Sequence, residues 1–186
     1  MNTKISFKSM VIALMAIVSM GTLTACSSDD DGGDNGISNN GAANALIISG
    51  KNYGNLPYAQ FMDWGDGYAS FIFSNVRMVN SIDQNAPLTF LSVRIPYSSA
   101  GIPTGTFSTD ADADFDVNRI ASTGSCELTG WCLKLTVMIT KSGDNYIVDF
   151  STSDLHIFHS DDEGGNGESG TLSLHYEGKI EVVNYN

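Results

Sequence analysis

The chain has 186 residues, of which 42% are hydrophobic and 16% are charged, and its formal net charge is −12. A chain of this length suits one folded domain after removal of segments that cannot join a core. With 9 basic against 21 acidic residues, the composition argues against binding to nucleic acid or to anionic membrane surfaces by electrostatic attraction.

Residues 1–25 form a leader that we exclude from the domain. Lys4 and Lys8 make its start positive, and residues 11–23 are mostly apolar and are followed by small residues. This combination is typical of a secretory signal peptide. The alternative is a transmembrane helix, but the run is shorter than the roughly 20 apolar residues that cross a bilayer. Removal of the leader leaves 7 basic and 21 acidic residues, a net charge of −14.

The end of the leader reads Leu23, Thr24, Ala25, Cys26. An aliphatic residue, two small residues and a cysteine in this order resemble the lipobox of bacterial lipoproteins. The resemblance implies that the Cys26 thiol takes a diacylglycerol group and that the leader is removed before it. A chance cysteine behind an ordinary signal peptide is the alternative. We favour the lipobox, and several acyl chains at about 0.8 kcal/mol per buried methylene would anchor the chain stably.

Residues 26–42 are rich in Ser, Asp, Gly and Asn and have no periodicity. We expect them to form a flexible acidic linker, with an all-β domain at 43–186. The run Ser-Ser-Asp-Asp-Asp-Gly-Gly-Asp at 27–34 resembles the export signal of Bacteroidota surface lipoproteins. This resemblance implies display on the outer face of the outer membrane, whereas a merely solvated linker is the alternative.

From residue 45 onward, apolar and polar residues alternate with the period of half-buried strands. The clearest segments are 45–49, 68–79, 91–97, 131–140, 146–150 and 172–182. Separated by Gly, Asn, Asp and Pro, they predict eight or nine strands in an antiparallel two-sheet β-sandwich. An up-and-down, lipocalin-like β-barrel is the alternative. Gly178 is expected to mark a bend or bulge in the last strand.

Aromatic residues are frequent just before and at the start of segment 68–79. The candidate ligand-binding residues are Tyr58, Trp64, Asp66 and Tyr68. Aromatic faces pack on sugar C–H groups, and carboxylates accept hydrogen bonds from sugar hydroxyls. The alternative is that the rings serve core and hairpin packing, and that Asp66 belongs to a turn.

Asp110, Asp112, Asp114 and Asp116 occupy every second position of one segment. In an extended chain they would share one side, and carboxylate oxygens suit Ca²⁺. The segment does not match an EF-hand loop, and four carboxylates along a strand are too widely spaced to hold one ion. We therefore favour an exposed acidic loop or edge that resists aggregation over a calcium site, and we expect no cofactor.

Cys126 and Cys132 remain once Cys26 is set aside, an even pair in an exported chain. This predicts a disulfide. A hairpin with its loop at residues 128–130 would place the two cysteines opposite one another, close enough to bridge. A metal site would need further ligands nearby, and none adjoins the pair.

No catalytic motif stands out. On a strand His156 and His159 would point to opposite faces, and we favour solvated loop histidines, His175 included, over a metal or acid–base site. There is no nucleophile elbow, zinc-protease helix motif or phosphate-binding loop. We therefore predict that the protein is not an enzyme.

Three segments, 102–107, 141–146 and 170–179, resemble in their order small all-β surface lipoproteins of Bacteroidota, over about the last two thirds of the domain. The resemblance implies an all-β fold and a location on the cell surface, but it identifies no active residues. We expect a lipid-anchored surface protein whose domain is a non-catalytic binding module for an extracellular glycan or protein. The alternatives are a structural or accessory component of a surface complex and, third, a small carbohydrate-active enzyme.

Overall fold

The computed structural model describes residues 43–78, 83–98, 100–108, 111–159 and 167–183. This part of the chain is all-β, without a helix, and none of its elements is a helix that could span a bilayer. Its strands are β1 (Ala45–Ile48), β2 (Lys51–Asn55), β3 (Tyr58–Asp63), β4 (Tyr68–Ser74), β5 (Leu88–Pro96), β6 (Gly105–Phe107), β7 (Asp112–Arg119), β8 (Leu128–Cys132), β9 (Thr136–Ser142), β10 (Asn145–His159), β11 (Glu168–Gly178) and β12 (Ile180–Val183). The predicted leader, Cys26 and the linker lie outside the described residues.

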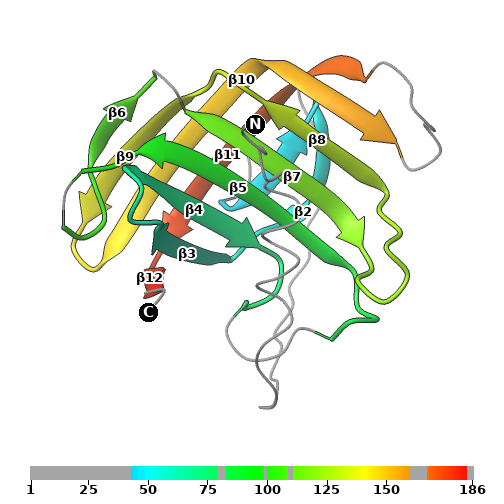
Figure 1. Ribbon diagram of the computed structural model, residues 1–186, viewed down its shortest axis with the longest axis horizontal. Helices are drawn as coiled ribbons and strands as arrows, with labels where there is room; N and C mark the ends of the chain where they lie inside the picture. Colours follow the sequence, from blue (N-terminus) through cyan, green and yellow to red (C-terminus); the bar gives the residue numbers. More distant parts are fainter. Residues whose placement is uncertain (1–42, 79–82, 99, 109–110, 160–166, 184–186) are drawn as a thin grey trace, which may run out of the picture.

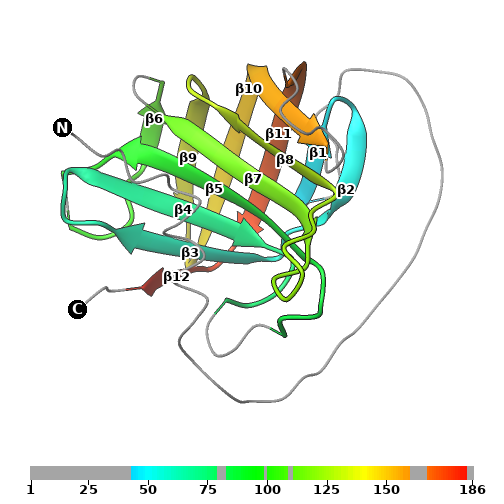
Figure 2. The ribbon, with the colours of Figure 1, turned by 45° about the vertical axis from the view of Figure 1, so that its right-hand side comes forward.

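The strands form one hydrogen-bonded network in a sandwich-like arrangement. Its main path runs β12-β3-β4-β5-β7-β8-β10-β11-β1-β2, and β6 and β9 extend from β10. Every pairing among the described strands is antiparallel except that of β12 with β3. In Figures 1 and 2 the sheet curves strongly, so that β3, β4, β5, β7 and β8 lie in front of β10, β11 and β1. The predicted all-β, sandwich-like fold is confirmed. More strands form than expected, because β2 and β6 are too short for a clear period-two pattern and the predicted strand at 172–182 divides into β11 and β12.

The long strand β10 joins the two parts of the sheet. On one side it pairs with β11 along most of its length. On the other side its residues 145–151 pair with β9, and its residues 156–159 pair with β8. The register with β11 shifts between Thr152 and Leu155. Because β8 and β9 diverge from one strand, the sheet can bend around a common interior.

The predicted single strand at 131–140 is wrong. β8 ends at Cys132 and β9 begins at Thr136, and the burial pattern changes phase between them. Cys132 and Leu135 are buried, whereas Leu133 is 62% exposed. The alternation of residue types continues through this segment, but the chain leaves β7 to pair with β6, and the bend reverses which side faces inward.

The last strand bends where the sequence predicts it. β11 ends at Gly178, where a Cβ atom would lie 2.6 Å from the Tyr176 hydroxyl, too close for any other residue. The Tyr176 hydroxyl donates to the Lys179 carbonyl at 2.7 Å, and β12 then runs parallel to β3. β11 and β12 are consecutive in the chain but pair with strands that are far apart in the sheet. They therefore hold the curved sheet over the core.

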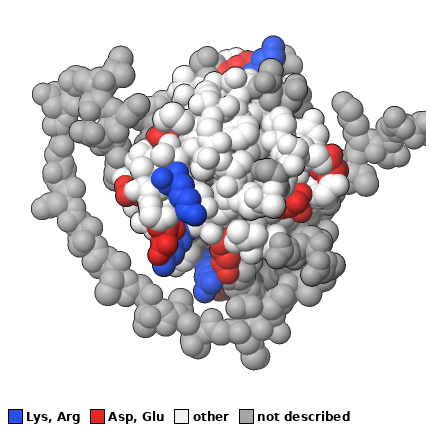
Figure 3. All heavy atoms as spheres, turned by 90° about the vertical axis from the view of Figure 1, so that its left-hand side faces the viewer, with Lys and Arg blue, Asp and Glu red and all other residues white. Residues whose placement is uncertain are grey.

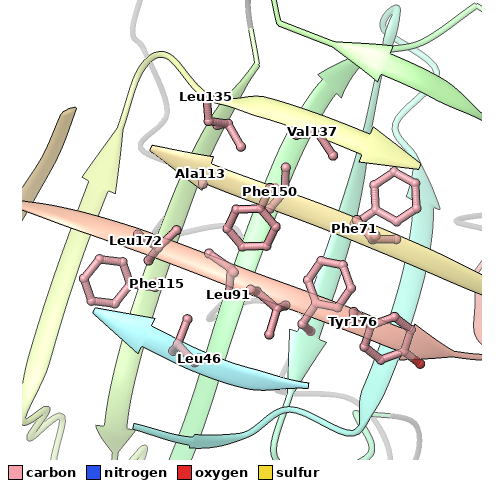
Figure 4. Packing of buried hydrophobic residues seen from close by; sticks show 14 of the residues in the cluster. Leu46, Phe71, Leu91, Ala113, Phe115, Leu135, Val137, Phe150, Leu172 and Tyr176 are labelled. Carbon is pink, nitrogen blue, oxygen red and sulfur yellow. The ribbon is translucent and has the colours of Figure 1, made fainter. Parts of the chain in front are cut away.

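One hydrophobic cluster fills the interior, built from the alternate residues of nearly every long strand. Figure 4 shows side chains from the two parts of the sheet meeting in a single layer. The rings of Phe61 and Phe71 lie 5.1 Å apart, as do those of Phe73 and Tyr176. Each large apolar side chain buried in this way contributes about 1.5–3 kcal/mol to stability. Met62, Ile72 and Phe90 are also buried but lie outside this cluster, on the opposite face of the sheet.

Candidate functional site

Three of the four predicted ligand-binding residues meet at the hairpin between β3 and β4. Asp66 Oδ1 accepts a hydrogen bond from the Tyr68 amide at 3.1 Å, and Asp63 accepts one from the Gly65 amide at 2.8 Å. Gly65 and Gly67 have φ angles of 71° and 88°, which glycine tolerates best. The turn interpretation of this segment is therefore confirmed, and the turn fixes where Trp64 and Tyr68 lie.

The hairpin directs its side chains to the outer face, by which we mean the face of the sheet opposite the core. Trp64 Nε1 donates to Ser70 Oγ at 2.9 Å, and Ser70 alternates with the core residues Ala69 and Phe71. Tyr58 stands at the other end of β3, about 17 Å away along the strand. It does not share a site with Trp64, and it lines a separate cavity instead.

Arg94 on β5 ties the hairpin to the neighbouring strands. Its guanidinium forms an ion pair with Asp66 at 3.2 Å and lies 3.8 Å from the centre of the Tyr68 ring. In the register Arg94 stands opposite Asp112 of β7. Burial raises the pKa of the Asp112 carboxyl, while the positive charge of Arg94 acts in the opposite direction. Arg94 was not among the predicted ligand-binding residues, although its position between Val93 and Ile95 already assigns it to the outer face.

The aspartate run is not the exposed loop or edge that we expected. It forms β7, which pairs with β5 on one side and with β8 on the other, so that Asp112, Asp114 and Asp116 line the outer face of an interior strand. Asp116 is buried and forms an ion pair with Arg119. Asp110 lies outside the described residues. Among those that are described, no three His, Cys, Asp or Glu side chains are placed to hold a metal ion.

Trp131 and His156 continue the outer face beyond β7. Trp131 of β8 stands between Asp114 and His156 in the register. The rings of Trp131 and His156 stack with centroids 4.3 Å apart and an interplanar angle of 20°. The prediction of loop histidines is wrong: His156 and His159 lie on β10, and His175 lies on β11 beside Asp149. His156 alternates with the buried residues Leu155 and Ile157. Stacking holds the indole in one orientation.

Ser92 is the polar residue at the middle of this face. It lies opposite Ile72 of β4 and opposite Asp114 of β7. Its side chain is 2% exposed, and its Oγ is the buried side-chain polar atom without a hydrogen-bond partner in the described part of the chain. An unsatisfied buried hydroxyl costs about 1–3 kcal/mol, so such an atom calls for an explanation.

Together these side chains form what we call the outer-face site: Trp64, Tyr68, Ser92, Arg94, Asp112, Asp114, Trp131 and His156. The strands from β4 to β10 are separated by four spacings, so the site spans about 19 Å. It combines aromatic rings with a guanidinium donor, carboxylate acceptors and a free hydroxyl. Most of its members come from strands far apart in the sequence.

The predicted disulfide between Cys126 and Cys132 is wrong. Residues 128–130, expected as a hairpin loop, belong to β8, which pairs with strands on both sides. Cys126 precedes this strand and Cys132 ends it, so the strand alone separates them by about 13 Å, beyond the roughly 7 Å limit for a bridge. Both thiols are free. That of Cys126 donates to the carbonyls of Val117 and Leu128, and burial raises the pKa of Cys132 to about 11.

No family model matches the chain, and no curated protein or solved structure matches it at a significant level.

Proposed function

We propose that this protein is a lipid-anchored module of the bacterial outer-membrane surface that binds an extracellular glycan, without catalysis, at the outer-face site. The observation that carries the proposal is the stacked pair of Trp131 and His156 beside Asp114. A sugar ring presents an apolar C–H face next to hydroxyl groups, and this surface offers a partner for each.

The arrangement suits a sugar because its polar groups include both donors and acceptors. Arg94 supplies N–H donors, and Asp112 and Asp114 supply carboxylate acceptors. The Trp131 ring is already oriented by His156, so little side-chain entropy is lost on binding.

The anchoring half of the proposal rests on the sequence. Cys26 would carry the lipid, and the acidic linker would hold the domain away from the membrane. A net charge of −14 after residue 25 would keep the domain from lying on an anionic bilayer, so the outer face would stay accessible.

The test is a glycan-array screen of the lipid-free chain starting at residue 27, followed by calorimetry with the best ligand. Trp131→Ala should weaken binding severalfold to about tenfold, because one stacked aromatic contact is worth about 0.5–1.5 kcal/mol beyond its buried area. Tyr53→Ala removes a half-buried aromatic residue on β2, away from the outer face, and should leave the affinity unchanged. Equal affinities of Trp131→Ala and the parent chain would contradict the proposal.

A further inference from the structure

A second concave region lies where β12 pairs with β3, separate from the outer-face site. The cavity has a volume of about 450 Å³, opens to solvent and is lined by residues 57–60, 77–78, 176 and 178–181. This volume lies within the roughly 300–1,000 Å³ range of small-molecule sites. Of the predicted ligand-binding residues only Tyr58 lines it, with 42% of its side chain exposed.

The cavity concentrates positive charge in a strongly acidic chain. Arg77 and Lys179, two of the seven basic residues that follow residue 25, both line it. Arg77 is held by Glu181 at 3.1 Å, and Lys179 has no ion pair with any residue in the described ranges. On the side of the molecule in Figure 3, basic and acidic side chains gather in the lower and outer parts and the centre is uncharged. An anion entering this cavity would meet one more cation than carboxylates.

The backbone fixes the position of these groups. The Tyr176 hydroxyl donates to the Lys179 carbonyl, and the parallel pairing of β12 with β3 sets Glu181 opposite Gln60. Gly178, next to Lys179, cannot accept a side chain because of its contact with Tyr176. The chain bend that closes the sheet therefore also builds the wall of the cavity.

We propose that this cavity binds a small uronic acid, a ring-shaped hydroxylated ligand that carries one carboxylate. The Arg77 guanidinium is planar and suits a carboxylate in a forked arrangement, and the Lys179 ammonium adds a second positive charge. The Tyr58 ring offers an apolar surface for the sugar ring, and Gln60 offers amide groups for its hydroxyls. This inference does not depend on glycan binding at the outer-face site.

Glu181 acts as the internal competitor of the ligand. Its carboxylate already occupies the Arg77 guanidinium, so an incoming carboxylate must share or displace that ion pair. Removing the charge of Glu181 should therefore tighten binding, which is the opposite of what loss of a structural ion pair would do to a folded site.

The experiment titrates D-glucuronate into the lipid-free chain starting at residue 27 and follows binding by NMR, with circular dichroism as a check of folding. Lys179→Met should weaken binding about tenfold, Tyr58→Ala should weaken it severalfold, and Glu181→Gln should tighten it severalfold. Lys134→Met removes the same charge from an exposed position outside the cavity and should change nothing. Trp131→Ala should also leave this binding unchanged, which separates it from the outer-face site.

D-Glucose and inorganic phosphate complete the test. D-Glucose has the same ring without the carboxylate and should not bind measurably, whereas phosphate should bind more weakly than D-glucuronate. The proposal is overturned if D-glucuronate does not bind, if phosphate binds as tightly, or if Lys134→Met and Lys179→Met weaken binding equally.

Discussion

The two faces of β4, β5 and β7 are built from the same strands and differ in composition. Inward-facing residues such as Phe71, Val93 and Phe115 are apolar and belong to one cluster. Outward-facing residues are mostly polar, with Ile72 and Phe90 as apolar exceptions, even though several of the polar ones are almost as buried as the core. Burial alone therefore does not identify the core. The inner face holds the fold together, whereas the outer face arranges polar groups.

The largest effect is expected from the inner face. Phe71→Ala removes a fully buried ring that contacts Phe61 and Phe73, and should lower the free energy of unfolding by about 3–5 kcal/mol. Urea denaturation of both chains measures this difference. Tyr53→Ala, at a half-buried position, is the matched control and should cost much less. Similar losses of unfolding free energy for the two variants would contradict the distinction between a fully buried ring and a half-buried one.

Two serines on the outer face should respond in opposite directions. Ser70 accepts a hydrogen bond from Trp64 Nε1, so Ser70→Ala should cost about 1 kcal/mol by removing that hydrogen bond. Ser92 has an unpartnered Oγ, so Ser92→Ala should be neutral or slightly stabilising. The same urea titrations measure both values. A cost for Ser92→Ala as large as that for Ser70→Ala would show that the Ser92 hydroxyl is already satisfied.

A smaller effect should come from the ionisation of Asp112. Burial raises the pKa of this carboxyl above its ordinary value of 3.8, so the folded chain binds the proton more tightly than the unfolded chain. Stability from this group is complete below that value and declines as the pH rises through the folded pKa. Asp112→Asn should therefore unfold at a higher temperature than the parent at neutral pH, with the gap closing near pH 3.8. A gap that is constant across this range would contradict the burial argument.

Much of the fold could be predicted because its signal is local. Alternation marks Ala69, Phe71 and Phe73 as one face of β4, and Leu172, Leu174 and Tyr176 as one face of β11, and all six are buried. The bend at Gly178 is local too. The interior position of β7 was missed because aspartates at every second position suggest an exposed loop or edge. Only the pairing with β5 and β8 shows that the strand is interior.

The candidate site was predicted only in part, because its partners come from distant strands. Trp64, Asp66 and Tyr68 share one hairpin, so proximity in sequence brought them together. The contacts of Arg94 with Asp66 and of Trp131 with His156 join residues 28 and 25 positions apart, which no local pattern encodes. The hairpin proposed for residues 126–132 failed for the same reason: Gly130 looked like a turn residue, but in β8 a Cβ there would lie 2.4 Å from the His156 carbonyl.

The central claim is that one face of the sheet folds the protein and the opposite face binds a glycan. The most direct measurement is a backbone and indole NMR titration of the lipid-free chain with the glycan that the array selects. We expect the NMR signals of the Trp131 indole and of the Ser92, Arg94 and Asp114 amides to shift together along one saturable curve. Shifts confined to β1, β2 and β11, with the Trp131 indole unmoved at saturation, would contradict it.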